Sequence, residues 1–159
     1  MENNEILYLL ENDSRLTAEQ LAVMLDKEVG EIKDMIKTYE KDGVILGYMA
    51  VVDWDKTDRE RVNALIEVKV APQRDRGFDK VAEKIYNYPE VQALFLMSGG
   101  FDLAVFVEAK NLKEIAHFVA HKLAVINDVT STATHFILHK YKDNSVVYNN
   151  FTEDLRGKL

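Results

Sequence analysis

Apolar residues in the first third of the chain recur every three to four positions, as they do along amphipathic helices. Their positions are Ile6, Leu9 and Leu10, then Leu21, Ala22 and Leu25, then Val29, Ile32, Ile36 and Tyr39. An asparagine at position 3 or 4 is a suitable cap for the first helix, which is expected to end near residues 12–13. Thr17 and Gln20 form a capping box for the second helix, over residues 18–25, and Gly43 closes the third.

The three helices are followed by an apolar segment without helical periodicity, VILGYMAVVD at residues 44–53. This segment predicts an extended strand. Three short helices with tight connections and a strand behind them are typical of a winged helix-turn-helix unit. A three-helix bundle with no role in DNA binding has the same periodicity and remains the alternative.

After a polar connector at residues 54–61, the pattern changes to alternating strands and helices. Strands are expected at residues 62–70, 91–97, 103–107 and 129–142, and helices at residues 78–88 and 112–126. Pro72 ends the first strand, Pro89 ends the first of these helices, and Asn111 caps the second. The order β-α-β-β-α-β predicts a ferredoxin-like domain over residues 62–143. The whole chain is therefore expected to be α+β, with domains at 1–53 and 62–143, a linker at 54–61 and a tail at 144–159.

The two central strands are joined across Ser98-Gly99-Gly100-Phe101-Asp102, which predicts a tight hairpin with a type I′ turn at the glycines. Both faces of the strand before the turn are apolar, so both faces of the sheet are expected to be covered. Both helices lie on one face of such a sheet. A second subunit must then cover the other face, and the pattern predicts at least a homodimer. Asp102 has two interpretations, a cap of the turn and a carboxylate that holds a ligand's ammonium group.

Composition excludes several classes of protein. The 159 residues include no cysteine, so disulfides and thiolate chemistry are excluded. No apolar run approaches the roughly 20 residues of a membrane-spanning helix, and the acidic N-terminus does not resemble a secretory signal. We therefore expect a cytoplasmic location and no membrane partner.

The sequence shows no constellation typical of an enzyme or a metal site. It contains no catalytic serine-histidine-aspartate order, no glycine-rich phosphate loop and no paired buried carboxylates. The histidines are interpreted as structural or solvated, although Glu114, His117 and His121 share one helix face and His135 and His139 share one strand face. No catalytic residue, metal or cofactor is predicted.

Four segments resemble the Lrp/AsnC family of feast/famine regulators, in the right order across both domains. They are ILYLLENDSRLTAEQLAVML at 6–25, YEKDGVILGYMAVVD at 39–53, PEVQALFLMSGGFDLAVFVEAKN at 89–111 and NDVTSTATHFIL at 127–138. The resemblance covers about residues 4–142. It implies a transcription factor whose second domain, called RAM, assembles dimers into tetramers or octamers.

The resemblance also implies that an amino-acid effector binds between dimers, near the hairpin turn. The family's site positions correspond here to Gly99, Gly100 and Asp102 at the turn, and to Thr132 and Thr134 in the last strand. A zwitterion needs a carboxylate for its ammonium group, and N–H or hydroxyl donors for its own carboxylate. These residues supply both kinds of group.

The third helix departs from the family pattern. Glu28 replaces the usual serine that opens it, and Met35 replaces an arginine. Residues 1–53 carry five basic and twelve acidic side chains, which accounts for the whole net charge of −7. The candidate DNA contacts are therefore few: Lys33, Lys37 and Lys41 on one stripe, with Lys27 and Arg15 as auxiliaries.

Two functional hypotheses follow from these observations. The first is an amino-acid-responsive regulator that binds DNA through the helix-turn-helix. The second is an amino-acid-binding oligomer whose acidic helix-turn-helix no longer binds DNA strongly. DNA affinity is largely electrostatic, so the acidic third helix is the feature that separates them.

Overall fold

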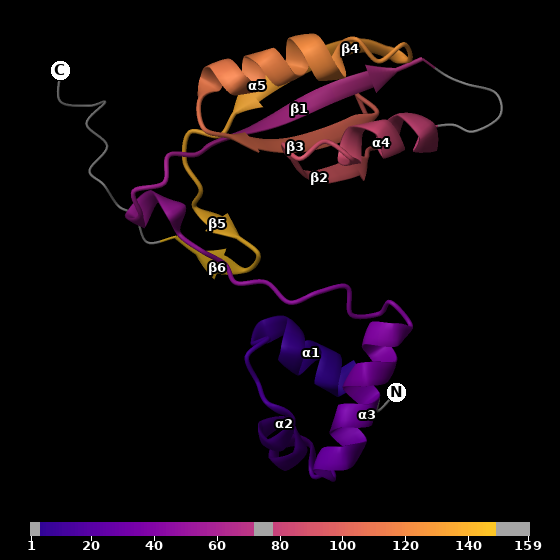
Figure 1. The fold of residues 1–159 in the computed structure, drawn as a ribbon, viewed down its shortest axis with the longest axis vertical. Helices are drawn as coiled ribbons and strands as arrows, with labels where there is room; N and C mark the ends of the chain where they lie inside the picture. The colour runs from indigo at the N-terminus through magenta and orange to yellow at the C-terminus, as the bar shows by residue number, and fades with distance from the viewer. Residues whose placement is uncertain (1–3, 72–77, 149–159) are drawn as a thin grey trace. The chain divides into compact units, whose positions relative to one another are not determined.

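The computed structural model describes residues 4–71 and 78–148, which form parts of two compact units, Met1–Val51 and Val52–Leu159 (Figure 1). The predicted linker at residues 54–61 belongs to the second unit and begins with a short 3₁₀ helix, Trp54–Lys56. Pro72 lies outside the described residues. Among those residues, no helix is both long and apolar enough to cross a membrane.

The first unit is a three-helix bundle. Its helices are α1, Glu5–Asn12; α2, Ala18–Leu25; and α3, Val29–Lys41. Its buried core consists of Ile6, Leu10, Leu21, Ala22 and Ile32, and every one of them was expected on a helix face turned inward.

The predicted helix ends are mostly confirmed. Thr17 Oγ1 accepts from the Gln20 N–H at 3.3 Å, and Gln20 Oε1 accepts from the Thr17 N–H at 2.9 Å, which completes the capping box. Gly43 has a φ of +69°, a left-handed conformation that glycine adopts without steric cost. Asn4 occupies the N-cap position of α1 but makes no side-chain cap hydrogen bond, so the prediction for Asn4 is wrong. Asn3 lies outside the described residues.

The predicted strand at residues 44–53 is absent from the described structure. This segment has no regular secondary structure and pairs with no strand of the described residues; Ile45 packs against the helical core, but most of its apolar side chains are exposed, Leu46 at 93%. A strand exists only where its N–H and C=O groups meet those of a neighbour, and residues 4–71 and 78–148 supply no such neighbour here. The helix-turn-helix therefore has no wing within this unit.

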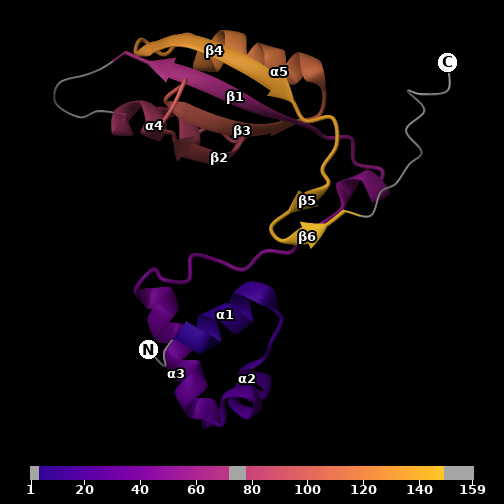
Figure 2. The same ribbon diagram turned by 180° about the vertical axis from the view of Figure 1, so that it is seen from behind.

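The second unit is an antiparallel sheet with helices on one face (Figures 1 and 2). Its elements are β1, Val62–Val70; α4, Asp79–Tyr86; β2, Val91–Leu96; β3, Leu103–Ala109; α5, Leu112–Phe118, which continues as a π-helix, Val119–Leu123; and β4, Val129–Phe136. The strand order is β2-β3-β1-β4, and a small separate hairpin follows from β5, Lys142–Asp143, and β6, Val146–Val147. The predicted α+β fold and the βαββαβ order are confirmed.

The core of this unit lies between the sheet and the two helices. Its members are Ala64, Ile66, Val68 and Val70 of β1; Leu103, Val105 and Val107 of β3; Val81 and Ile85 of α4; and Ile115, Phe118, Leu123 and Ile126 around α5. Asn111 caps α5 as predicted, accepting from the Glu114 N–H at 3.0 Å. The opposite face of the sheet, which we call the open face, carries Phe95 and Phe106 in edge-to-face contact at 6.0 Å. Phe95 is 54% exposed, so a large apolar group on this face is left uncovered by the chain itself.

The hairpin and the last strand differ from prediction. The Met97 N–H donates to the Asp102 carbonyl at 2.8 Å, so four residues form the loop rather than two. Only Gly99 of the glycine pair has a positive φ, +153°, which excludes a type I′ turn at Gly99-Gly100. β4 ends at Phe136 instead of residue 142: its last pair is with Ala64, and beyond it the Ile137 N–H donates to the Asn63 carbonyl at 2.9 Å, close to the start of β1 at Val62.

Neighbouring residues of β3 test this arrangement. Val105 is fully buried against the helices, whereas Phe106 lies on the open face. We expect Val105→Lys to unfold the second unit, because an unpaired buried charge costs several kcal/mol. Phe106→Lys should leave the unit folded and weaken self-association. Circular dichroism melting and light scattering separate the two effects, and equal loss of folding in both variants would contradict the one-sided core.

Candidate nucleic-acid interface and effector site

Three of the five cations proposed for DNA contact form ion pairs within the first unit. Lys33 Nζ lies 3.0 Å from Glu19 Oε1, which joins α3 to α2, and the hydrogen bond from Lys33 lowers the pKa of Glu19. The Arg15 guanidinium binds Asp13 at 2.9 Å and lowers the pKa of that carboxyl to about 2. Lys27, just before α3, pairs with Glu31 in the first turn of that helix. These side chains are therefore partly neutralised before any phosphate approaches.

Lys37 and Lys41 are the exception. Both are exposed on the second half of α3, four residues apart, and neither has an ion pair among the described residues. Because positions i and i+4 are neighbours on a helix surface, the two ammonium groups point to the same side. They form the cationic part of the candidate nucleic-acid interface.

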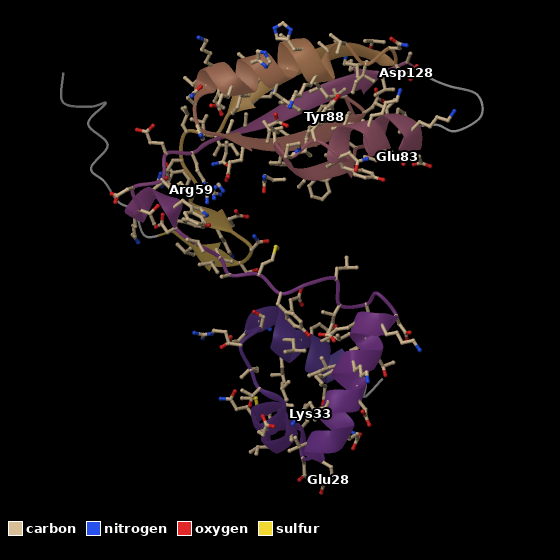
Figure 3. All side chains as sticks on the ribbon, in the orientation of Figure 1. Glu28, Lys33, Arg59, Glu83, Tyr88 and Asp128 are labelled. Atoms are coloured by element: carbon tan, nitrogen blue, oxygen red, sulfur yellow. The ribbon has the colours of Figure 1, made fainter. Side chains whose placement is uncertain are left out.

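The first half of α3 is acidic. Glu28 occupies its N-cap and makes no side-chain cap hydrogen bond, as expected from the sequence, and Glu31 and Asp34 are exposed in the following turns. Figure 3 shows Glu28 at the start of the helix, with Lys33 further along it. In helix-turn-helix proteins this end of the helix faces the base edges. The charge of α3 thus changes sign along its length.

Asp102 is built into the sheet. Its carboxylate Oδ2 accepts from the Val70 N–H at 2.8 Å, and its own N–H donates to the Val68 carbonyl at 3.0 Å. The side chain therefore ties the hairpin mouth to the end of β1 rather than capping the turn. Gly99 and Gly100 lie in the same loop, with open space around both Cα atoms. The structure brings these three candidate effector residues together.

Thr132 and Thr134 lie apart from them. Both threonines are on β4, where they pair with Val68 and Ile66 of β1. The hairpin strand β3 pairs with the other side of β1. Two strand spacings, about 10 Å, separate β3 from β4. Within one chain, β1 stands between the two halves of the predicted effector site.

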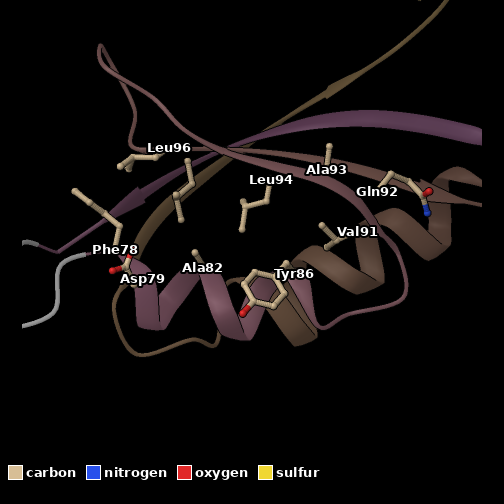
Figure 4. Close-up of a pocket in the computed structure, with 10 residues that line it drawn as sticks. Phe78, Asp79, Ala82, Tyr86, Val91, Gln92, Ala93, Leu94 and Leu96 are labelled. Atoms are coloured by element: carbon tan, nitrogen blue, oxygen red, sulfur yellow. The ribbon is translucent and has the colours of Figure 1, made fainter. Parts of the chain in front are cut away.

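A groove of about 330 Å³ lies between α4 and β2 (Figure 4). Its lining is mainly apolar and includes Ala82, Tyr86, Leu94 and Leu96, with Asp79 at one end. It was not expected from the sequence. The sequence feature that could have predicted this groove is the pair of apolar helix-facing residues of β2, Leu94 and Leu96, which α4 covers only in part.

A second, polar cavity of about 120 Å³ surrounds an ion pair that the sequence analysis also missed. Arg61 Nη1 lies 2.5 Å from Glu108 Oε1 and donates to Oε2 at 2.7 Å, with both side chains more than four-fifths buried. The Trp54 ring covers the Arg61 guanidinium at 4.0 Å. Arg59, labelled in Figure 3, lies 5.0 Å from the same ring. Asn63 of β1 pairs with Glu108 of β3. Arg61 is two residues before Asn63 and is therefore close to the Glu108 carboxylate.

The histidines make local contacts. His117 and His121 lie ring to ring at 4.4 Å, and His135 Nε2 lies 3.2 Å from Glu67. Across the described residues, no three histidine or carboxylate side chains are grouped closely enough to hold a metal ion.

The Lrp/AsnC ligand-binding domain, as a family profile, matches residues 63–147. That is more than half of the chain. The protein belongs to the Lrp/AsnC family of transcriptional regulators.

Relatives of known sequence support this family membership over nearly the whole chain. The HTH-type transcriptional regulator YugG of Bacillus subtilis is 44% identical over 96% of this chain and 92% of its own length. An HTH-type transcriptional regulator of Pyrococcus furiosus is 32% identical over 83% of this chain and 86% of its own length.

Solved Lrp/AsnC structures share the fold. A transcriptional regulator of Neisseria meningitidis, crystallised in complex with L-Met, has a TM-score of 0.73 at 21% identity and covers 99% of this chain and 97% of its own. AsnC of Escherichia coli has a TM-score of 0.67 at 18% identity, over 87% of this chain and 91% of its own.

The position of Asp102 predicts a structural cost when its side chain is removed. Asp102→Ala leaves the Val70 N–H without its acceptor, and we expect the free energy of unfolding to fall by about 1–3 kcal/mol. Ser98→Ala, in the same loop, is the control and should change it by less than about 0.5 kcal/mol. Urea unfolding measures both. Equal stability of the two variants would show that the Asp102 bond contributes nothing.

Proposed function

We propose that this Lrp/AsnC regulator binds DNA through α3 and changes its assembly or affinity when an amino acid binds the second domain. The observation that carries the DNA half is the exposed, unpaired Lys37 and Lys41 on the third helix of a helix-turn-helix unit. Lysines that contact phosphates position a protein on the duplex and carry no sequence information. Recognition of bases then depends on the acidic half of α3, where a carboxylate accepts from cytosine N4.

The charge balance sets the strength of this binding. Two free lysines per subunit release few counterions, and the first 53 residues hold a net charge of −7. We expect weak non-specific affinity that is visible chiefly at low salt. Oligomerisation compensates, because several helix-turn-helix units on one assembly bind one DNA with a high effective concentration.

Amino-acid binding is proposed at the hairpin loop. The loop supplies backbone N–H groups at Gly99 and Gly100, and Oδ1 of Asp102 has no hydrogen bond within the described residues, whereas Oδ2 accepts from Val70. These groups suit the carboxylate and the ammonium of a zwitterion. The L-Met complex of the neisserial relative supports an amino acid as the ligand class.

Assembly completes this effector site in the proposal. Thr132 and Thr134 are separated from Asp102 by β1, so one chain does not offer them to the same small ligand. We infer that they come from a neighbouring subunit. The open face, with the exposed Phe95, is the proposed dimer interface, and larger assemblies bring hairpin loops and β4 strands of different subunits together.

The second candidate function is an amino-acid-binding oligomer without strong DNA affinity. One observation favours it: Lys33 is engaged with Glu19 and Arg15 with Asp13, which leaves the α2–α3 surface dominated by carboxylates. Such a surface repels phosphate. The same DNA experiment decides between the two functions.

The DNA experiment measures affinity against salt. Fluorescence anisotropy follows binding to the fragment upstream of the protein's own coding region, from about 50 to 200 mM KCl, with and without pooled amino acids. The Lys37→Ala/Lys41→Ala variant should weaken binding to all sequences alike. Each lost phosphate contact should flatten the slope of log K against log salt by about 0.9. Glu19→Gln should strengthen binding, because it frees Lys33.

Lys113→Ala on α5 serves as the matched control, since it removes one exposed lysine from the second unit and should leave the slope unchanged. Absence of binding at about 50 mM KCl by a correctly assembled protein, with and without amino acids, would rule out the regulator and favour the second candidate.

The effector experiment uses Asp102→Asn. Asparagine retains an oxygen that accepts from the Val70 N–H, so the fold should persist while the charge is lost. The twenty L-amino acids are first screened by thermal shift on the wild-type protein. Titration calorimetry with the strongest binder should then show a loss of about 2 kcal/mol or more, roughly 30-fold in Kd. Unchanged affinity would assign Asp102 a purely structural role.

A further inference from the structure

Two of the four histidines lie one turn apart on the exposed side of the α5 segment. His117 and His121 are both exposed, whereas Ile115, Phe118 and Leu123 of the same segment are buried. The two ring centroids are 4.4 Å apart, and the ring planes are tilted by 37°. We call His117 and His121 the α5 histidine pair. Neither the DNA half nor the effector half of the proposed function uses it.

The α5 histidine pair spans an irregular point of the helix. His117 belongs to the α-helical part, Leu112–Phe118, and His121 to the π-helical part, Val119–Leu123. The Ala124 N–H donates to the Val119 carbonyl at 2.8 Å, five residues back instead of the four of an α-helix. π-helical turns are rare and occur frequently at functional sites. A ligand shared by the two rings would hold the α turn and the π turn in a fixed position relative to each other.

The chemistry of imidazole limits what the pair can bind. A neutral ring has one nitrogen with a free lone pair, whereas two protonated rings at this distance repel each other. Imidazole nitrogens suit Zn²⁺, Ni²⁺ and Cu²⁺, and two histidines at positions i and i+4 on one helix face have the spacing of a zinc-binding pair. Mg²⁺ and Ca²⁺ prefer oxygen ligands instead. The pair therefore matches a divalent transition-metal cation.

A carboxylate near the pair also favours a cation. Glu90 lies just before β2 and forms an ion pair with Lys122, the residue after His121. Burial favours the neutral form of Glu90, but the hydrogen bond from Lys122 and the charges of Lys122 and His117 outweigh burial and lower its pKa. Glu90 Oε2 is buried and has no hydrogen-bond partner among the described residues. The carboxylate thus stays ionised close enough to His117 for the two side chains to interact electrostatically.

We propose that His117 and His121 chelate one Zn²⁺ ion, or another cation of the same class, through one nitrogen of each ring. The described residues supply no third protein ligand, so water occupies the remaining positions. Closed structural zinc sites use four protein ligands. A site with two is open and exchangeable, and it gains or loses its ion as the concentration of free metal changes.

The proposed metal site is separate from the other sites of the domain. α5 packs on the helix face of the sheet, whereas the proposed dimer interface is the open face. The effector loop at Gly99 and Gly100 belongs to the β2–β3 hairpin. Metal binding therefore goes beyond the proposed function and does not depend on it.

The first test is titration calorimetry of the untagged full-length protein with ZnCl₂, in a buffer with excess Mg²⁺ to occupy oxygen sites. We expect the wild type to bind one Zn²⁺ per chain. Loss of an outer-shell partner already weakens a metal site about 10- to 100-fold, so His117→Ala or His121→Ala should weaken binding at least about tenfold. Absence of zinc binding by the wild type overturns the inference, as does undiminished binding by either variant.

The matched control is the His135→Ala/His139→Ala variant, which removes the other two imidazoles of the chain. It should bind zinc like the wild type. Loss of zinc binding in this control would assign the ion to His135 and His139 and overturn the inference.

The second test measures thermal unfolding by circular dichroism with and without ZnCl₂. Both histidines are exposed, so the His117→Ala/His121→Ala variant should fold and melt like the metal-free wild type. Zinc should raise the melting temperature of the wild type, because an ion that binds the folded helix stabilises it. The variant should show no such rise, and an equal rise in both proteins overturns the chelate. Neither test uses DNA or an amino acid, so failure of the proposed function would leave both results interpretable.

Discussion

The second domain depends on β1. This strand pairs with both β3 and β4, and its alternate residues from Ala64 to Val70 face the helices and are buried. Asp102 binds it twice, through Val68 and Val70, and so holds the hairpin loop against its end. The loop proposed to bind an effector is thereby attached to the most buried strand of the domain. A ligand that moved this loop would act directly on the hydrogen bonds of β1.

The sheet has helices on one face only, and this asymmetry organises the proposed assembly. The helix face is complete within one chain, with Phe118 and Ile85 closing over β1 and β3. The open face leaves Phe95 exposed, and β2, at the edge of the sheet, is paired on one side only among the described residues. Segment 44–53 exposes apolar side chains as well, among them Leu46 and Met49. Each of these surfaces is energetically incomplete in a single chain, since both apolar area and backbone polar groups favour partners.

The helix-turn-helix unit follows its family in fold and departs from it in charge. Its core of Ile6, Leu21 and Ile32 is ordinary, and its capping box is intact. Its surface pairs Lys33 with Glu19, which lies on the preceding helix. Exposed ion pairs of this kind contribute little to stability, so their main effect here is on charge. They reduce the positive potential available to DNA and leave Lys37 and Lys41 as the lysines of α3 without an ion pair in the part of the chain that the structure describes.

The sequence alone determined the elements whose signal is local. Thr17 and Gln20 predicted a helix start, Gly43 a helix end, and the alternation from Ala64 to Val70 a half-buried strand, because capping and side-chain periodicity act within a few residues. It also identified the loop that holds Gly99, Gly100 and Asp102. It did not reveal that Asp102 binds β1, that Lys33 binds Glu19, or that Arg61 binds Glu108, since each pair joins residues far apart along the chain. It placed strands at residues 44–53 and 137–141, where apolar and β-branched residues favour them but the described residues supply no paired strand. Tertiary structure decided these points, because a strand or an ion pair requires a second partner, and only the folded chain determines which partners meet.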